Sequence, residues 1–265
     1  MRRVALGSVV GLVLVLAVGG VRLHAYNPGA HIYIVQRSLG TLGPNVDYGA
    51  LASDIVWYAN PPTLDWVAAH TFDDLSSFAD TFLERRFAKG WMTHNELWGA
   101  DAFAHGPNGY VVLKAGQLAQ LFPSVPFLQG YDNPLGHSAI EMAIDLLLKR
   151  QDPLLGSKVM SAALWRSPDG PELLVQQGLT DAATLTAAEG VFRDLLVRYG
   201  WALALPAPLD RQAMAQLASQ IAKQVYQTDV SPQQAAVILN AAIQLCRSDY
   251  LIPINQAIAS VRNNM

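Results

Sequence analysis

Apolar residues recur at spacings of three and four along most of this 265-residue chain, and few β-branched runs alternate with polar residues. Such spacing places the apolar side chains on one face of a helix, whereas a half-buried strand needs a period of two. Hydrophobic residues make up 51% of the chain, which is enough for a sizeable core. We therefore expect an all-α fold built from many helices.

Proline and glycine divide the first part of the chain into segments. A turn-rich stretch spans residues 40–48, Pro61 and Pro62 stop the segment before them, and a Gly-Pro-Asn-Gly turn begins at Gly106. The expected helices cover residues 31–39, 71–87 and 90–105, and a further one begins near His137, while the structure of residues 50–58 is left open.

Residues 153–265 differ from the first part because they contain no histidine. They carry helix-start signals instead: Thr186 with Glu189, and Ser231 with Gln234, both form capping-box patterns. We interpret this part as a C-terminal extension of structural helices packed on the same domain. Cys246, the single cysteine, cannot form an intrachain disulfide, and we expect it to be buried in a helix.

The first 25 residues have the pattern of a secretory signal peptide. Arg2 and Arg3 precede an apolar run over residues 4–21, and Ala25 ends a small-residue cleavage site. The alternative is an uncleaved membrane anchor, since the apolar run is just long enough. The pattern predicts a secreted or periplasmic protein. Without residues 1–25 the chain keeps 21 acids and 15 lysines and arginines, so its net charge is −6.

Most of the histidines form an ordered series with three carboxylates before residue 142. Imidazole nitrogens and carboxylate oxygens are ligands that Zn²⁺ accepts. The candidate metal ligands are His31, Asp54, His70, His94, Asp101, His105, His137 and Glu141. Several buried ionisable groups are costly unless they share a metal or a partner, so the series favours a metallohydrolase.

Two spacings in this series fit one face of a helix. His137 and Glu141 are four residues apart, and His94, Asp101 and His105 are separated by seven and then four. On an unbroken helix the last three would lie within about 20° of one line. The chain has no Gly-rich phosphate loop and no Gly-x-Ser-x-Gly elbow for serine hydrolysis.

Residues 26–150 resemble the zinc-dependent phospholipase C family, whose all-helical domain also occurs in glycosylphosphatidylinositol-specific phospholipase D. HIYIVQRSL looks like the first family helix, ALASDIVWY like the loop with an aspartate, and HTFDD like the segment with the next histidine. The helix with His94, Asp101 and His105 and the final His-x-x-x-Glu follow in the family's order. The chain departs from the family at two places, with Tyr26 where tryptophan is usual and a gap of six residues between His94 and Asp101 where three are usual.

The resemblance implies two to three zinc ions. One ion would bind the Tyr26 amine, His31 and Asp101, and the last ion would bind His105, His137 and Glu141. The middle ion would share Asp101 with the first, and its ligands would be Asp54, His70, His94 and Asp101. The first of these sites requires Tyr26 to be the first residue after cleavage, with His31 five residues further on.

The activity implied is hydrolysis of phospholipids by a zinc-activated water, with Asp54 as the residue that orients or deprotonates it. The expected partner is a phospholipid or another phosphodiester, with contact to a membrane surface. One alternative is a single-strand-specific zinc nuclease, although a net charge of −6 gives it no electrostatic help and no specific nucleic acid is expected. Another is a non-catalytic helical scaffold that binds a partner. Trp91, Trp98, Phe103, Tyr110 and Tyr131 are candidates for a pocket lining, although core positions are the more common use of such residues.

Overall fold

The computed structural model describes residues 27–40, 43–60, 74–106, 108–129 and 133–265, and this part of the chain contains helices and no strand. The expected all-α fold is thereby confirmed. The first half contributes α1 (Pro28–Leu39), α2 (Pro44–Ala52), η1 (Ser53–Tyr58), η2 (Leu75–Phe78), α4 (Phe82–Met92), α5 (Ala100–His105), α6 (Tyr110–Leu121), η3 (Pro126–Leu128) and α7 (Pro134–Leu148). The second half contributes α8 (Leu155–Trp165), α9 (Asp169–Gln176), α10 (Ala182–Ala204), α11 (Leu209–Val225), α12 (Pro232–Cys246) and α13 (Leu251–Asn264).

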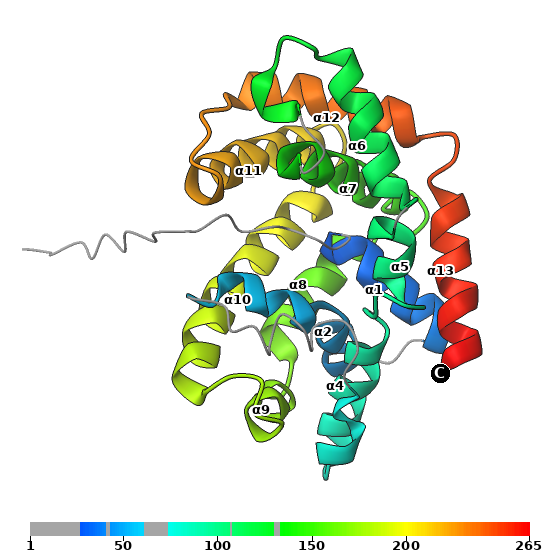
Figure 1. Ribbon diagram of the computed structural model, residues 1–265, viewed down its shortest axis with the longest axis vertical. Helices are drawn as coiled ribbons and strands as arrows, with labels where there is room; N and C mark the ends of the chain where they lie inside the picture. Colours follow the sequence, from blue (N-terminus) through cyan, green and yellow to red (C-terminus); the bar gives the residue numbers. More distant parts are fainter. Residues whose placement is uncertain (1–26, 41–42, 61–73, 107, 130–132) are drawn as a thin grey trace, which may run out of the picture.

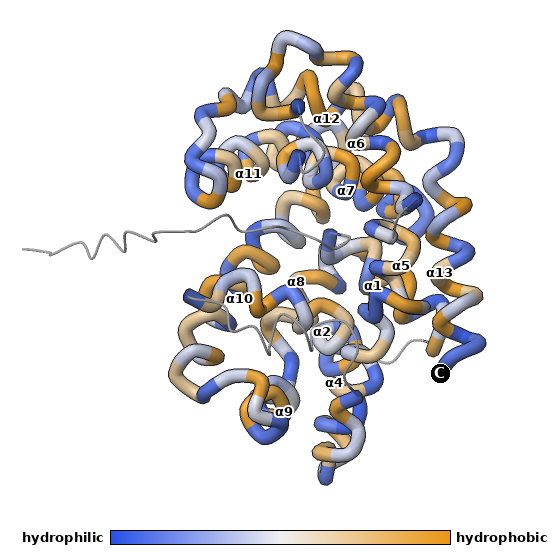
Figure 2. The backbone as a smooth tube through the Cα atoms, viewed as in Figure 1, coloured by the Kyte–Doolittle hydropathy of each residue, from blue (hydrophilic) through white to orange (hydrophobic). Residues whose placement is uncertain are grey.

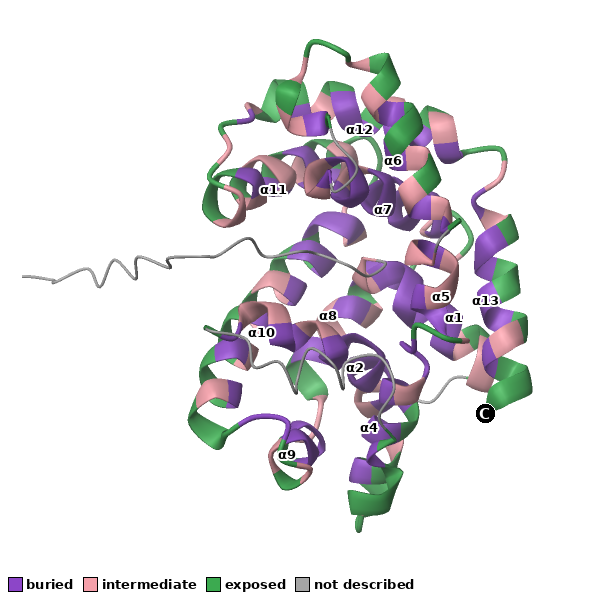
Figure 3. Ribbon diagram, viewed as in Figure 1, coloured by how far each residue is buried: buried purple, intermediate pink, exposed green. Residues whose placement is uncertain are grey.

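Helices α1 and α7 lie at the centre of the arrangement. Helix α1 packs against α2, α7, α8 and α13, and α7 packs against α6, α11 and α12 (Figure 1). Hydrophobic and hydrophilic residues alternate along most helices (Figure 2), and buried residues are concentrated in α1, α2 and α7 (Figure 3). A single large apolar cluster joins both halves of the chain, so the helices after residue 152 share the core of the first part.

Two glycines let α2 and α4 approach each other closely. A Cβ on Gly49 would collide with the carbonyl oxygen of Phe87, and a Cβ on Gly90 would collide with that of Val46. The close contact matters for the site because α2 ends beside His94, two residues after α4. Substitution of either glycine would push the two helices apart.

The prediction of one helix over residues 90–105 is wrong, because α4 ends at Met92 and α5 begins at Ala100. The Asn95 carboxamide oxygen accepts hydrogen bonds from the backbone N–H groups of Leu97 and Trp98, at 2.7 and 3.2 Å. Its backbone carbonyl also accepts one from Gly99, at 2.8 Å. These hydrogen bonds from nearby backbone groups to Asn95 replace the helical ones, so the chain forms a turn here.

Three other expected boundaries are wrong. The turn-rich stretch at 40–48 is shorter than expected, since α2 begins at Pro44, and the helix expected over 71–87 begins at Phe82 behind a Thr81–Glu84 capping box. Helix α10 begins four residues before Thr186, with Asp181 as its cap. Residues 50–58, whose structure the sequence left open, form the end of α2 and the 3₁₀ helix η1.

Four other local expectations are confirmed. Helix α1 contains residues 31–39 and begins three residues earlier, and α7 begins beside His137 as expected. Ser231 and Gln234 form the expected capping box, with Pro232 as the first helical residue. Cys246 is buried at the end of α12.

Among the described helices, no single one is long and apolar enough to cross a membrane. Helices α12 and α13 pass that test only as a pair, and they meet at an angle of 69°. The expected leader, residues 1–25, lies outside the described residues.

Candidate metal centre

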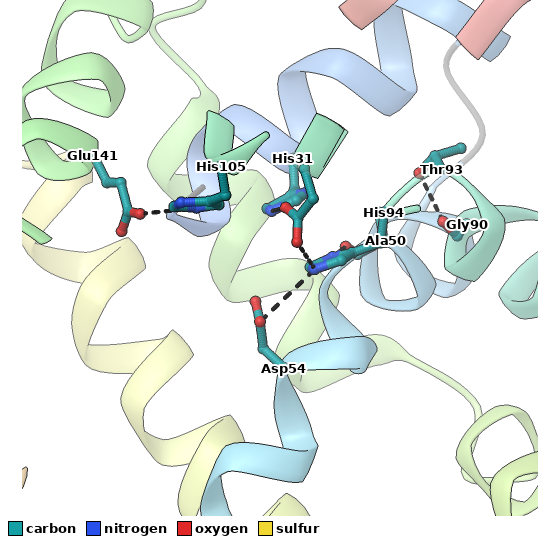
Figure 4. A network of polar contacts seen from close by, with 9 residues as sticks. His31, Ala50, Asp54, Gly90, Thr93, His94, His105 and Glu141 are labelled. Carbon is teal, nitrogen blue, oxygen red and sulfur yellow. Dashed lines mark hydrogen bonds and ion pairs between the residues drawn. The ribbon is translucent and has the colours of Figure 1, made fainter. Parts of the chain in front are cut away.

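Seven of the expected ligands are described, and they come from five separate segments. His31 lies on α1, Asp54 on η1, His94 in the loop between α4 and α5, Asp101 and His105 on α5, and His137 and Glu141 on α7. The fold brings them together in two sets, which share helix α5 (Figure 4). We call the first set the Asp101 group (His31, Asp54, His94 and Asp101) and the second the Glu141 group (His105, His137 and Glu141).

The Asp101 group is compact and almost fully buried. Nε2 of His94 lies 3.1 Å from Oδ2 of Asp101 and 3.8 Å from Oδ1 of Asp54, and Nε2 of His31 lies 3.7 Å from Oδ1 of Asp101. Ligand atoms bound to one tetrahedral Zn²⁺ at about 2.1 Å are separated by roughly 3.4 Å. The measured separations bracket that value, so these residues fit a zinc ion.

A backbone contact fixes the orientation of the His94 ring. Nδ1 of His94 lies 3.0 Å from the carbonyl oxygen of Ala50, which can only accept a hydrogen, so Nδ1 carries the proton. Nε2 then points at the carboxylates of Asp54 and Asp101 (Figure 4). A histidine that ligates zinc uses its other ring nitrogen in the same way, to donate to a backbone carbonyl.

The rings of His31 and His94 are stacked, with centroids 4.3 Å apart and planes within 5°. Two charged imidazolium rings in this arrangement would repel each other. At most one of the two rings is therefore charged, and the carboxylates of Asp101 and Asp54 raise the pKa of His94 to about 9 against its burial, so the group draws positive charge to Nε2 of His94. One ligand atom from each of His31, His94 and Asp101 lies within 4.8 Å of the others, the geometry of a metal-binding triad.

The Glu141 group lies at the other end of α5. Nε2 of His105 is 3.4 Å from Oε1 of Glu141, and the His105 and His137 rings have centroids 5.9 Å apart. His137 and Glu141 are one turn apart on α7, as their spacing predicts. These three residues offer the two nitrogens and one carboxylate of a second site, with the His105 side chain 10% exposed.

Burial and charge shift the pKa values of the acids in opposite directions. Burial alone would raise the pKa of Asp101, but His94, followed by His31 and His105, outweighs it and holds the pKa at about 2. Burial raises the pKa of Asp54 to about 7, against the attraction of His94. Burial also raises the pKa of Glu141, and His105 opposes that shift. Asp101 is thus the carboxylate most firmly held in its charged form.

Asp145 positions the first helix, although the sequence pattern gave no role to it. Its carboxylate is fully buried and accepts hydrogen bonds from the backbone N–H of Gly29 at 2.8 Å and the Tyr199 hydroxyl at 2.9 Å. It therefore fixes the start of α1, two residues before His31. The available signal was the continued spacing of four along α7, from His137 through Glu141 to Asp145.

A recess opens beside the two ligand groups. Asp54 and Glu141 form part of its wall, together with the start of α1 and residues of α10 and α11. Its aromatic residues are Tyr58, Phe192 and Tyr199.

The aromatic residues that the sequence suggested as a pocket lining lie elsewhere. Trp91 is in the core and Trp98 packs against it, while Phe103 and Tyr110 line a separate surface hollow beside α13. Tyr131 lies outside the described residues, as do the expected ligands Tyr26 and His70. Helical spacing alone does not determine which face of a helix packs against which neighbouring helix, so the sequence could not place these aromatic residues.

Comparison of the chain with models of protein families, with characterised proteins and with solved structures gave no significant match.

Proposed function

We propose that this protein is a zinc-dependent phosphodiesterase that hydrolyses phospholipids in the manner of a phospholipase C. The observation that carries the proposal is the orientation of His94. Its Nδ1 donates to the Ala50 carbonyl, so Nε2 presents a lone pair to two carboxylates. The two carboxylates raise the pKa of His94 to about 9 despite its burial, so this position attracts positive charge, and a zinc ion at these separations would supply that charge in place of the ring proton.

Bound zinc would supply a nucleophilic hydroxide from water at neutral pH and would offset the negative charge of a phosphodiester. Asp101 and His94, with His31, would hold that ion in the buried part of the site. His105, His137 and Glu141 would hold a second ion nearer the other end of α5. Most of these side chains are buried, so packing would hold them in place around the ion.

Asp54 is the residue suited to handle the proton of the attacking water. It is a partly exposed carboxylate that lies in the Asp101 group and also lines the recess. In the proposed step water attacks phosphorus and gives its proton to Asp54, and the bond from phosphorus to the glycerol oxygen breaks. That oxygen takes up a proton from solvent, and Asp54 releases its proton to solvent, which restores the carboxylate. The products are diacylglycerol and a phosphorylated head group.

The first test is elemental analysis of the protein beginning at Tyr26, with mass measurement of its N-terminus. We expect two to three zinc ions per chain, and release of a phosphorylated head group from phosphatidylcholine vesicles. Less than one zinc after reloading would contradict the proposal. Cleavage of single-stranded DNA with phosphatidylcholine left intact would replace it with a nuclease.

The role of Asp54 is tested with an Asp54→Asn variant. We expect it to lose at least about a hundredfold in turnover, the size of effect typical of a positioned general base. Asp249→Asn is a matched control, because Asp249 pairs with Lys114 beside α13 and lies outside both ligand groups. An Asp54→Asn variant with full zinc and full turnover would remove Asp54 from the mechanism.

A further inference from the structure

The recess beside the ligands is lined by both charged and apolar side chains. The space in and before it, open solvent included, is about 700 Å³. Asp54 and Glu141 contribute carboxylates, and Phe192 and Leu195 of α10 and Ile221 of α11 contribute apolar surface. A molecule in this recess would have its charged end at the metal ligands and its other end against apolar side chains.

A second hollow adjoins the recess and is lined by residues of α7, α11 and α12. It encloses about 460 Å³ on the same measure. Ser138, Met142 and Ile221 line both hollows, so the two meet at these side chains. Methionine is unbranched and adapts to irregular space, so Met142 can yield to a chain that passes from one hollow into the other.

Ser138 is the only polar side chain among the described residues that line the second hollow. It is 8% exposed, and its hydroxyl oxygen is buried without a hydrogen-bond partner among the described residues. A buried hydroxyl left in this condition is costly. A ligand oxygen or N–H at the junction of the hollows would satisfy it.

We infer that the two hollows together bind the hydrocarbon tail of the substrate, with Ser138 contacting the ester or amide that joins the tail to its alcohol. The inference rests on the proposed function for the charged end of the ligand. It gives the helices after residue 152 a role, since α10, α11 and α12 build the apolar walls.

The composition of the walls selects a tail over a nucleic acid. The described lining residues of the two hollows include no lysine or arginine, which phosphate backbones require. Apart from Ser138, the described lining of the second hollow consists of aliphatic side chains, Met142 and one aromatic residue, Phe127. Such a surface gains free energy with each methylene that it removes from water.

The test is the binding of methyl-, butyl- and octylphosphonate to the zinc-loaded protein by titration calorimetry. We expect the dissociation constant to fall about threefold to fourfold per methylene until the hollows are filled. Ile221→Trp, which fills the junction, should abolish this dependence on length while zinc content stays the same. Val237→Trp is the matched control, since Val237 is 59% exposed on α12. Leu195→Trp serves as a second blocking variant should Ile221→Trp fold poorly.

A second measurement separates the tail site from the metal site. We expect 1-octanol to raise the Tm of the metal-free protein and of Val237→Trp, but not that of the blocking variant. If phosphonates do not bind and octanol behaves in this way, the tail site stands and the proposed function fails. Equal affinity for methyl- and octylphosphonate, or an equal rise in Tm in the blocking variant, would overturn the inference.

Discussion

The Asp101 group and the Glu141 group use the same ligand types but differ in how the fold holds them. In the Asp101 group, ligands from three helical segments and a loop converge below the surface, and the Ala50 carbonyl fixes the His94 ring. The Glu141 group is built from one turn of α7 and the last residue of α5, so two of its three ligands already lie together on one helix. The comparison indicates that the Asp101 group is a structural as well as a chemical centre, whereas the Glu141 group is easier to form and easier to lose.

Removal of all metal should have the largest effect. We expect a chelator to abolish hydrolysis and to lower the Tm by roughly 10 °C, from an ion present at a thousand times its dissociation constant. Zinc should leave in two steps, first from the Glu141 group and later from the Asp101 group, when metal content is measured against chelator concentration. Loss of all zinc in one step would show that the two groups do not differ in affinity.

Substitution of Asp101 should have an effect nearly as large as the removal of all metal. Asp101→Asn weakens the carboxylate that lies against both His31 and His94, so we expect loss of zinc from that group and a fall in turnover of at least about a hundredfold, more than loss of a supporting contact costs. Zinc content and head-group release measure the two effects. Asp249→Asn should keep both, and an Asp101→Asn variant that keeps its full zinc would contradict the assignment.

Substitution of Glu141 should have a smaller effect. Glu141→Gln leaves His105 and His137 in place, so we expect loss of one zinc ion, a fall in Tm of roughly 5 °C and a fall in turnover of about tenfold to a hundredfold. Metal analysis, a thermal scan and the hydrolysis assay report these. A larger fall in Tm than for Asp101→Asn would reverse the comparison between the groups.

Asp47 is a buried carboxylate outside both ligand groups, and it serves as a reference for how burial alone changes stability. It is 3% exposed and accepts a hydrogen bond from Gln36 at 2.9 Å, and burial raises its pKa from 3.8 to about 7. Between pH 4 and 7 the unfolded chain therefore loses this proton while the folded protein keeps it, so stability falls as the pH rises through that range and levels off above it.

Asp47→Asn should remove that part of the fall. We expect the variant to gain about 1 kcal/mol over the unaltered protein between pH 6 and pH 8, or roughly 2 to 4 °C in Tm. Thermal scans of both zinc-loaded proteins at the two pH values measure it. Parallel pH dependence in the two proteins would show that Asp47 ionises freely in the folded state.

Local sequence signals predicted the parts of the fold that depend on neighbouring residues. The period of three and four predicted the helical class, and the Ser231–Gln234 box predicted the start of α12. The pair His137 and Glu141 was placed correctly because both lie on one continuous helix. Thr186 and Glu189 show the limit of such signals. Their capping-box pattern lies inside α10, and the helix begins four residues earlier because Asp181 accepts hydrogen bonds from two backbone N–H groups.

The sequence by itself determined which residues can bind a metal and their order along the chain, because ligand chemistry belongs to the side chain. Only the tertiary structure decided how His94 meets Asp101. The helix that would have aligned them is broken by Asn95, and the close crossing of α2 and α4 at Gly49 and Gly90 brings the Ala50 carbonyl to the ring. The tail site was equally invisible in the sequence, since its walls join residues of α7 to residues of α11 about eighty positions away. Local spacing carries no information about such contacts, which depend on how all the helices pack around one core.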